Sequence, residues 1–164
     1  MKELTEQPSA WAQRFTIPSP ITGTCLPLTS IASASLQLGA WGMGVALQPG
    51  NQRVHLHKDW ACYDVSPDRR DWSIRSTNPH QPLKAHLRIW PPYEELPWAS
   101  QSDEPGTLFI LNPKAFQQAE PCLISLTIPT YSKLSWRPSH GPVSALTSDV
   151  ISLYLNPKFP ERTE

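Results

Sequence analysis

Nineteen prolines spread through 164 residues are the feature that most restricts what this chain can fold into. Proline has no backbone N–H to donate and clashes with the preceding helical turn, so this spacing disfavours long helices. Short apolar runs lie between turn-forming Pro, Gly, Asn and Asp, which recur about every 8 to 12 residues, as in antiparallel sandwiches and barrels. The sequence therefore predicts an all-β fold, an antiparallel β-sandwich or a flattened barrel.

The length fits one domain with its own core. We expect a β domain over residues 15–158, preceded by a tail or short helix at 1–14 and followed by a tail at 159–164. The N-terminal residues are polar and include acids, unlike a secretory signal peptide. The most apolar stretch, Ile31–Leu47, is interrupted by Ser and Gln and is not a credible membrane span.

Ten short runs are predicted as strands from their apolar character and flanking turns. They cover 24–28, 44–48, 53–57, 61–65, 72–75, 83–89, 107–111, 122–128, 143–146 and 150–155. The run 83–89 alternates strictly, so Lys84, His86 and Arg88 are expected on one face and the apolar residues on the other.

Composition removes several classes of function. Lys plus Arg balance Asp plus Glu at 14 each, which provides no field for nucleic acid or an anionic membrane. Cys25, Cys62 and Cys122 have no metal-type spacing and are expected in the core. His55 and His57 share one side of a strand, but no third ligand follows at a recognisable spacing. We therefore expect no metal, no cofactor and a cytoplasmic location.

Two phrases at a fixed interval carry a family resemblance. Ser19–Leu28 resembles the strand phrase S-P-V-S-G-x-V-x-x-L that opens the glucose-type IIA phosphocarrier domains of the bacterial sugar phosphotransferase system. Gly42–Pro49 is similar to their phrase G-D-G-V-A-I-x-P, and the match continues without a gap towards Ile74. Later, Phe116–Ile128 and Gly141–Val143 resemble two further phrases of the family. The resemblance covers roughly residues 19–155 and implies the fold of those domains.

The chemistry of that family uses two histidines on neighbouring strands. One takes a phosphoryl group from a small carrier protein and passes it to the permease, and the second stabilises the phosphohistidine. The resemblance places Arg70 on the first histidine position and Asp68 on its supporting threonine. It places Arg88 on the second, or His86 if the register shifts by two residues. A guanidinium stays protonated at neutral pH and is no nucleophile.

The resemblance thus implies a degenerate IIA-like protein that does not carry phosphate by the two-histidine mechanism. We expect a regulatory or protein-binding module, a pseudo-phosphotransferase rather than an enzyme. Its partners would be a transporter, a metabolic enzyme or phosphotransferase components, with no nucleic acid and no membrane insertion. The expected binding residues are Arg70, Arg88, His86, Asp68, Leu36 and Trp41, the last two in an apolar docking ring.

Three other interpretations stay open at this point. The chain can be an active phosphocarrier that relays phosphate through His86 in sugar uptake. It can be a structural domain whose ancestral face is buried in a larger assembly. The arginines can also be ordinary surface residues that pair with Asp68 and Asp71, an interaction that contributes little.

Overall fold

A computed structural model describes residues 1–91 and 97–161 of the chain. Within these ranges the chain forms 14 β-strands, two 3₁₀ turns and one α-helix of 4 residues, which confirms the predicted all-β class. No helix in the described ranges has the length and apolar character needed to cross a membrane. The expected tail at 159–164 ends in residues 162–164, which lie outside the described residues.

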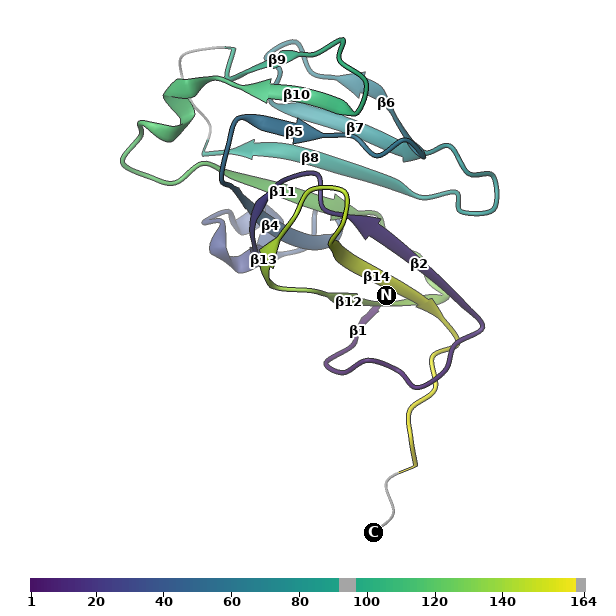
Figure 1. Cartoon of the computed structure of the whole chain (residues 1–164). Helices are drawn as coiled ribbons and strands as arrows, with labels where there is room; N and C mark the ends of the chain where they lie inside the picture. The colour runs from purple at the N-terminus through teal and green to yellow at the C-terminus, as the bar shows by residue number, and fades with distance from the viewer. Residues whose placement is uncertain (92–96, 162–164) are drawn as a thin grey trace.

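The largest sheet has seven strands in the order β13-β3-β4-β11-β8-β7-β6, and all its neighbours are antiparallel (Figure 1). Its strands are β3 (Gly23–Pro27), β4 (Met43–Pro49), β6 (Trp60–Val65), β7 (Asp71–Ser76), β8 (Lys84–Trp90), β11 (Leu123–Ile128) and β13 (Gly141–Val143). Each of these strands overlaps a run that the sequence predicts. The predicted run 143–146 instead ends in a turn, where Leu146 has a φ of 63°.

Two smaller sheets complete the fold. One has the order β1-β12-β14-β2 and the other β5-β10-β9. Their strands are β1 (Lys2–Glu3), β2 (Gln13–Pro18), β12 (Leu134–Pro138), β14 (Asp149–Leu155), β5 (Arg53–His55), β9 (Ala99–Gln101) and β10 (Thr107–Leu111). Residues 1–14 contain no helix, contrary to one expectation for them, because β1 pairs in parallel with β12 and Leu4 is buried.

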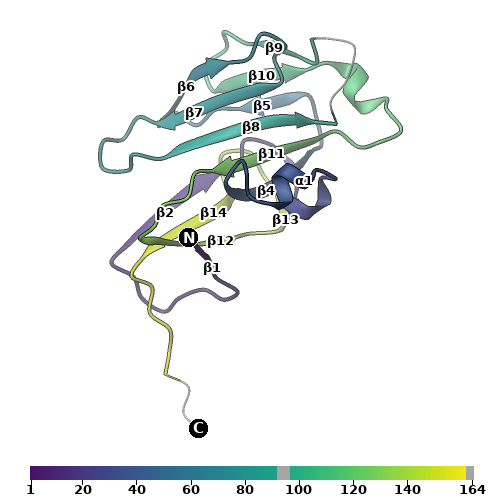
Figure 2. The same cartoon turned by 180° about the vertical axis from the view of Figure 1, so that it is seen from behind.

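The core lies between these sheets, on one face of the seven-stranded sheet (Figures 1 and 2). Alternation sends every second side chain of its strands into this core, as in Leu87 and Ile89 of β8. Trp72 of β7 is fully buried and stacks on Phe109 of β10 at 4.5 Å between ring centroids. Figure 2 shows helix α1 (Ala34–Gln37) beside β4, where Leu36 packs in a second, smaller cluster with Ala46.

Candidate functional site

Strands β7 and β8 bring the predicted site residues together. Asp71 lies opposite Arg88 in the register, and Ser73 lies opposite His86. Directly opposed residues of an antiparallel pair project to the same face, so the side chains of Asp71, His86 and Arg88 form one group. The intervening Leu87 is fully buried in the core. The shared face of His86 and Arg88 is the one that the alternation of the strand sequence predicts.

A tight turn before β7 fixes the position of Arg70. The Oδ1 atom of Asp68 accepts hydrogen bonds from the Ser66 hydroxyl at 2.5 Å and from the Arg70 backbone N–H at 3.1 Å. The Ser66 hydroxyl oxygen also accepts from the backbone N–H of Asp71 at 2.9 Å. These bonds, the one from Ser66 above all, hold the pKa of Asp68 below its ordinary value. Asp68 therefore shapes the turn that presents Arg70.

The two arginines meet over one indole ring. The Cζ atom of Arg70 lies 4.6 Å from the Trp90 ring centroid, and that of Arg88 lies 5.0 Å from it. Arg70 Nε donates to the Ile89 carbonyl at 2.8 Å, whereas Arg88 Nη1 donates to Asp71 Oδ1 at 3.3 Å. Burial first, and then the charge of Arg88, lower the pKa of Arg70. The attraction of each guanidinium to the aromatic ring offsets part of the repulsion between the two cations.

His86 lies inside the same group rather than free in solvent. Its Nε2 atom is 3.0 Å from Asp71 Oδ1, and its ring stacks on Trp41 with centroids 5.2 Å and planes 15° apart. The Asp71 carboxylate and the Trp41 ring therefore both contact the His86 imidazole.

Local sequence explains how Trp41 reaches this position. Ser33 caps the start of α1 by accepting from the Leu36 backbone N–H at 3.4 Å. At the other end, Gly39 N–H donates to the Leu36 carbonyl and Ala40 N–H to the Ser35 carbonyl, both at 3.0 Å, with Gly39 at a φ of 77°. This is a Schellman ending, and it reverses the chain so that Trp41 lies over β8.

Leu36 does not belong to the exposed surface. Its side chain is 2% exposed and packs with Ile31, Ala46 and Leu123 beneath Trp90. The expectation that it forms part of a docking ring needs correction, because α1 turns this side chain towards the sheet. The most exposed apolar residue of this segment is Leu38, at 85%, which follows α1.

Trp90 lies at the centre of the site, although it was not among the binding residues expected from the sequence. Its indole N–H donates to the Ser125 hydroxyl at 2.9 Å, which anchors the ring on β11 beneath both guanidinium groups. The signal for this residue was present, because Trp90 continues the i, i+2 series of His86 and Arg88 along β8. Ser125 carried no such signal, since its contact depends on the pairing of β8 with β11.

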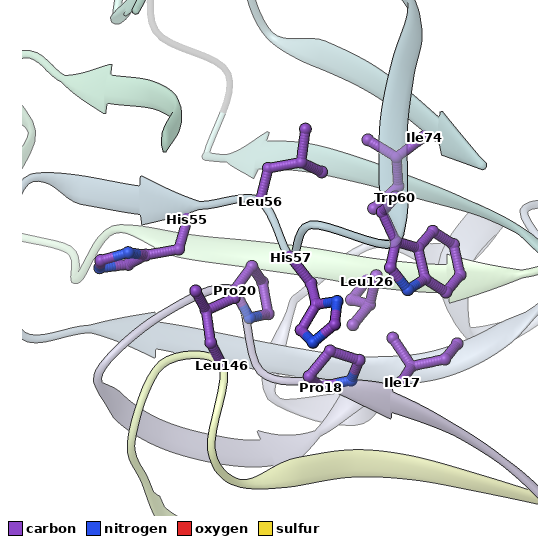
Figure 3. Close-up of a pocket in the computed structure, with 10 residues that line it drawn as sticks. All are labelled: Ile17, Pro18, Pro20, His55, Leu56, His57, Trp60, Ile74, Leu126 and Leu146. Atoms are coloured by element: carbon purple, nitrogen blue, oxygen red, sulfur yellow. The ribbon is translucent and has the colours of Figure 1, made fainter. Parts of the chain in front are cut away.

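The remaining sequence candidates form no second site of this kind. His55 and His57 line a small cavity of about 20 Å³ where the sheets meet, together with Trp60 (Figure 3). That volume holds about one water molecule. Within the described ranges no three His, Cys, Asp or Glu residues gather as a metal site would require. Cys25 is buried and free, and burial raises its pKa to about 12.

Comparison with known proteins identifies a solved structure with a similar fold. No protein-family model matches the chain, and no curated protein matches it. The structure is similar to that of glucose permease IIA from Mycoplasma capricolum, with a TM-score of 0.62 and 12% sequence identity. The match covers 85% of this chain and 96% of that chain. The chain therefore has the fold of glucose permease IIA, as the two phrases of its sequence predict.

Proposed function

We propose that this chain is a cytoplasmic IIA-like protein that binds other proteins and does not carry phosphate by the two-histidine mechanism. One observation carries the proposal. Arg70, just before β7, and Arg88 of β8, which the resemblance places on the two histidine positions, both lie within 5.0 Å of the Trp90 ring centroid. Guanidinium groups thus take the positions that the resemblance assigns to the two histidines, and a guanidinium is not a nucleophile.

The surroundings of His86 support this proposal over the active alternative. Its Nε2 atom lies 3.0 Å from Asp71 Oδ1, and Trp41 stacks on the ring. A phosphoryl group on this ring would add negative charge next to the Asp71 carboxylate.

Phosphate transfer is tested directly with labelled phosphoenolpyruvate, enzyme I and the small histidine carrier of the phosphotransferase system. We expect no acid-labile phosphate on the wild-type chain, while glucose permease IIA from Mycoplasma capricolum is labelled in the same mixture. Phosphate on the wild type that disappears in His86→Ala would overturn the proposal and establish the phosphocarrier alternative.

Protein binding is tested by affinity capture from the native host with quantitative mass spectrometry. The wild type is compared with the double variant Arg70→Glu, Arg88→Glu, which reverses the charge of the site. A matched control, Arg53→Glu, changes an exposed arginine that pairs with Glu104 on the separate sheet of β5 and β10. We expect partners that only the double variant loses, and an unchanged set of partners would contradict a docking role for this face.

A further inference from the structure

The Arg70 guanidinium is a half-buried cation next to Trp90. Within the described ranges Arg70 takes part in no ion pair, and its hydrogen bond runs from Nε to a backbone carbonyl. Its Nη2 atom is buried and has no hydrogen-bond partner among the described residues, and the same holds for Nε of Arg88. Buried donors of this kind are rare in folded proteins, because each costs the free energy of its lost hydration.

Two described carboxylates, those of Asp71 and Asp68, lie near Arg70 and raise its pKa by their charge, but one oxygen of each is engaged elsewhere. Asp71 Oδ1 accepts from Arg88 and lies 3.0 Å from His86 Nε2. Asp68 Oδ1 accepts from Ser66 and from the Arg70 backbone within its own turn. The two guanidinium groups are partly exposed and lie over one indole ring, and arginine suits the recognition of a carboxylate or phosphate.

An exposed apolar edge lies next to these donors. The turn after α1 carries Leu38, which is 85% exposed, and Trp41, which is 38% exposed and contacts Arg88 at 4.9 Å from Cζ to ring centroid. Tryptophan and arginine side by side have the composition of interaction hot spots. Further along the same face, Arg75 and Lys84 each lie 5.7 Å from the ring of Tyr63.

We propose that the Arg70–Arg88 pair receives a carboxylate of an acidic segment in a protein partner, while the turn of Leu38 and Trp41 contacts an apolar side chain next to it. This inference rests on the proposed function, since it names the kind of partner that the same site takes. A protein acid fits better than a nucleic acid, because the chain as a whole has no net positive charge. The cations Arg75 and Lys84 extend the same complementarity along the sheet face.

The probe is an acetylated and amidated peptide of four glutamates around one leucine, titrated into ¹⁵N-labelled full-length chain. Side-chain arginine Nε–H and tryptophan indole signals report binding. We expect saturable shifts of the Arg70, Arg88 and Trp41 signals, and no shifts with the peptide in which glutamines replace the glutamates. Arg70→Gln should weaken the affinity about tenfold or more, because a charge-assisted hydrogen bond is lost. Arg70→Lys should restore only part of it, since lysine lacks the planar fork.

Arg53→Gln is the matched control, since it removes an exposed arginine away from the site and should leave the peptide affinity unchanged. Circular dichroism melts show whether each variant stays folded. Equal shifts with the glutamine peptide, or no shifts with either peptide, would overturn the inference. Binding of inorganic phosphate without peptide binding would overturn it in favour of a small-anion site. These outcomes leave the phosphate-transfer result untouched, so the inference and the proposed function fail separately.

Discussion

Replacing Gly42 with alanine tests whether the turn that carries Trp41 is fixed by backbone geometry. Gly42 has a φ of 96°, and an ideal Cβ on it would lie 2.0 Å from the carbonyl oxygen of Ile128. That oxygen belongs to the backbone at the end of β11, so no side-chain rotation relieves the contact. Gly39 offers the matched control, because its φ is 77° and a Cβ there would meet nothing within 4 Å.

The two substitutions differ in one physical contribution. Both place an L-residue in left-handed backbone at about 1 to 2 kcal/mol, and both regain about 0.4 to 1 kcal/mol because the unfolded chain becomes stiffer. Only Gly42→Ala adds the displacement of a packed backbone, an overpacking cost of about 1 to 3 kcal/mol. We therefore expect a loss of about 2 to 4 kcal/mol for Gly42→Ala and about 1 kcal/mol for Gly39→Ala.

Equilibrium unfolding in urea, followed by tryptophan fluorescence, measures both losses. With a urea dependence of about 2 kcal/mol per molar, Gly42→Ala should lower the midpoint by about 1 to 2 M and Gly39→Ala by about 0.5 M. In Gly42→Ala the stacking of Trp41 on His86 should also loosen, and a shifted Trp41 indole N–H signal in an NMR spectrum would show this. Equal midpoints for the two variants would refute the reasoning from the close approach to Ile128.

Three further variants test the electrostatics and packing of the fold. Burial raises the pKa of Cys25 from 9.0 to about 12, so the folded state keeps a proton that the unfolded chain loses. The contribution of the Cys25 thiol to the free energy of unfolding is therefore complete below about pH 9 and falls by about 1.4 kcal/mol per pH unit towards pH 12. Urea titrations at several pH values should show a shallower decline in stability for Cys25→Val. An equal decline in the two proteins would contradict this assignment. Asp71→Asn removes the charge shared by His86 and Arg88 and should cost about 1 to 2 kcal/mol in urea unfolding, whereas a loss near zero would show that the pairing adds no stability. Trp41→Ala uncovers the His86 ring, so diethylpyrocarbonate should modify it several-fold faster by mass spectrometry, and an unchanged rate would mean that Trp41 does not shield it.

The sequence was most informative where structure is local. Strict alternation over residues 83–89 was sufficient to place Lys84, His86 and Arg88 on one face, because a strand imposes that period whatever its neighbours are. The turn before β7 is also held by contacts between residues that are close in the sequence. Its Asp68 bonds to Ser66 and Arg70, two residues away on either side, and such bonds form wherever the chain turns in this way.

Contacts between distant segments escaped prediction. β1 has only two residues and pairs with β12, which lies more than 130 positions further along the chain. A strand this short has no periodic pattern from which it could be predicted. Leu36 was misplaced for a different reason. Ser33 and Gly39 are an N-cap and a C-terminal glycine at the spacing of a short helix, a signal that the dominant β pattern obscured. Which face of that helix meets the sheet still depends on packing against Ala46 and Leu123.

Both ends of the seven-stranded sheet are built in ways that resist polymerisation. A sheet that stops at an exposed strand offers free N–H and C=O groups, on which another molecule can add a strand. At one end, β13 has only three residues and includes Pro142, which donates no hydrogen bond. At the other, the register of β6 shifts between Cys62 and Asp64, which bends the strand and breaks its regular row of groups. Copies of this protein are thereby hindered from joining edge to edge into aggregates at high concentration.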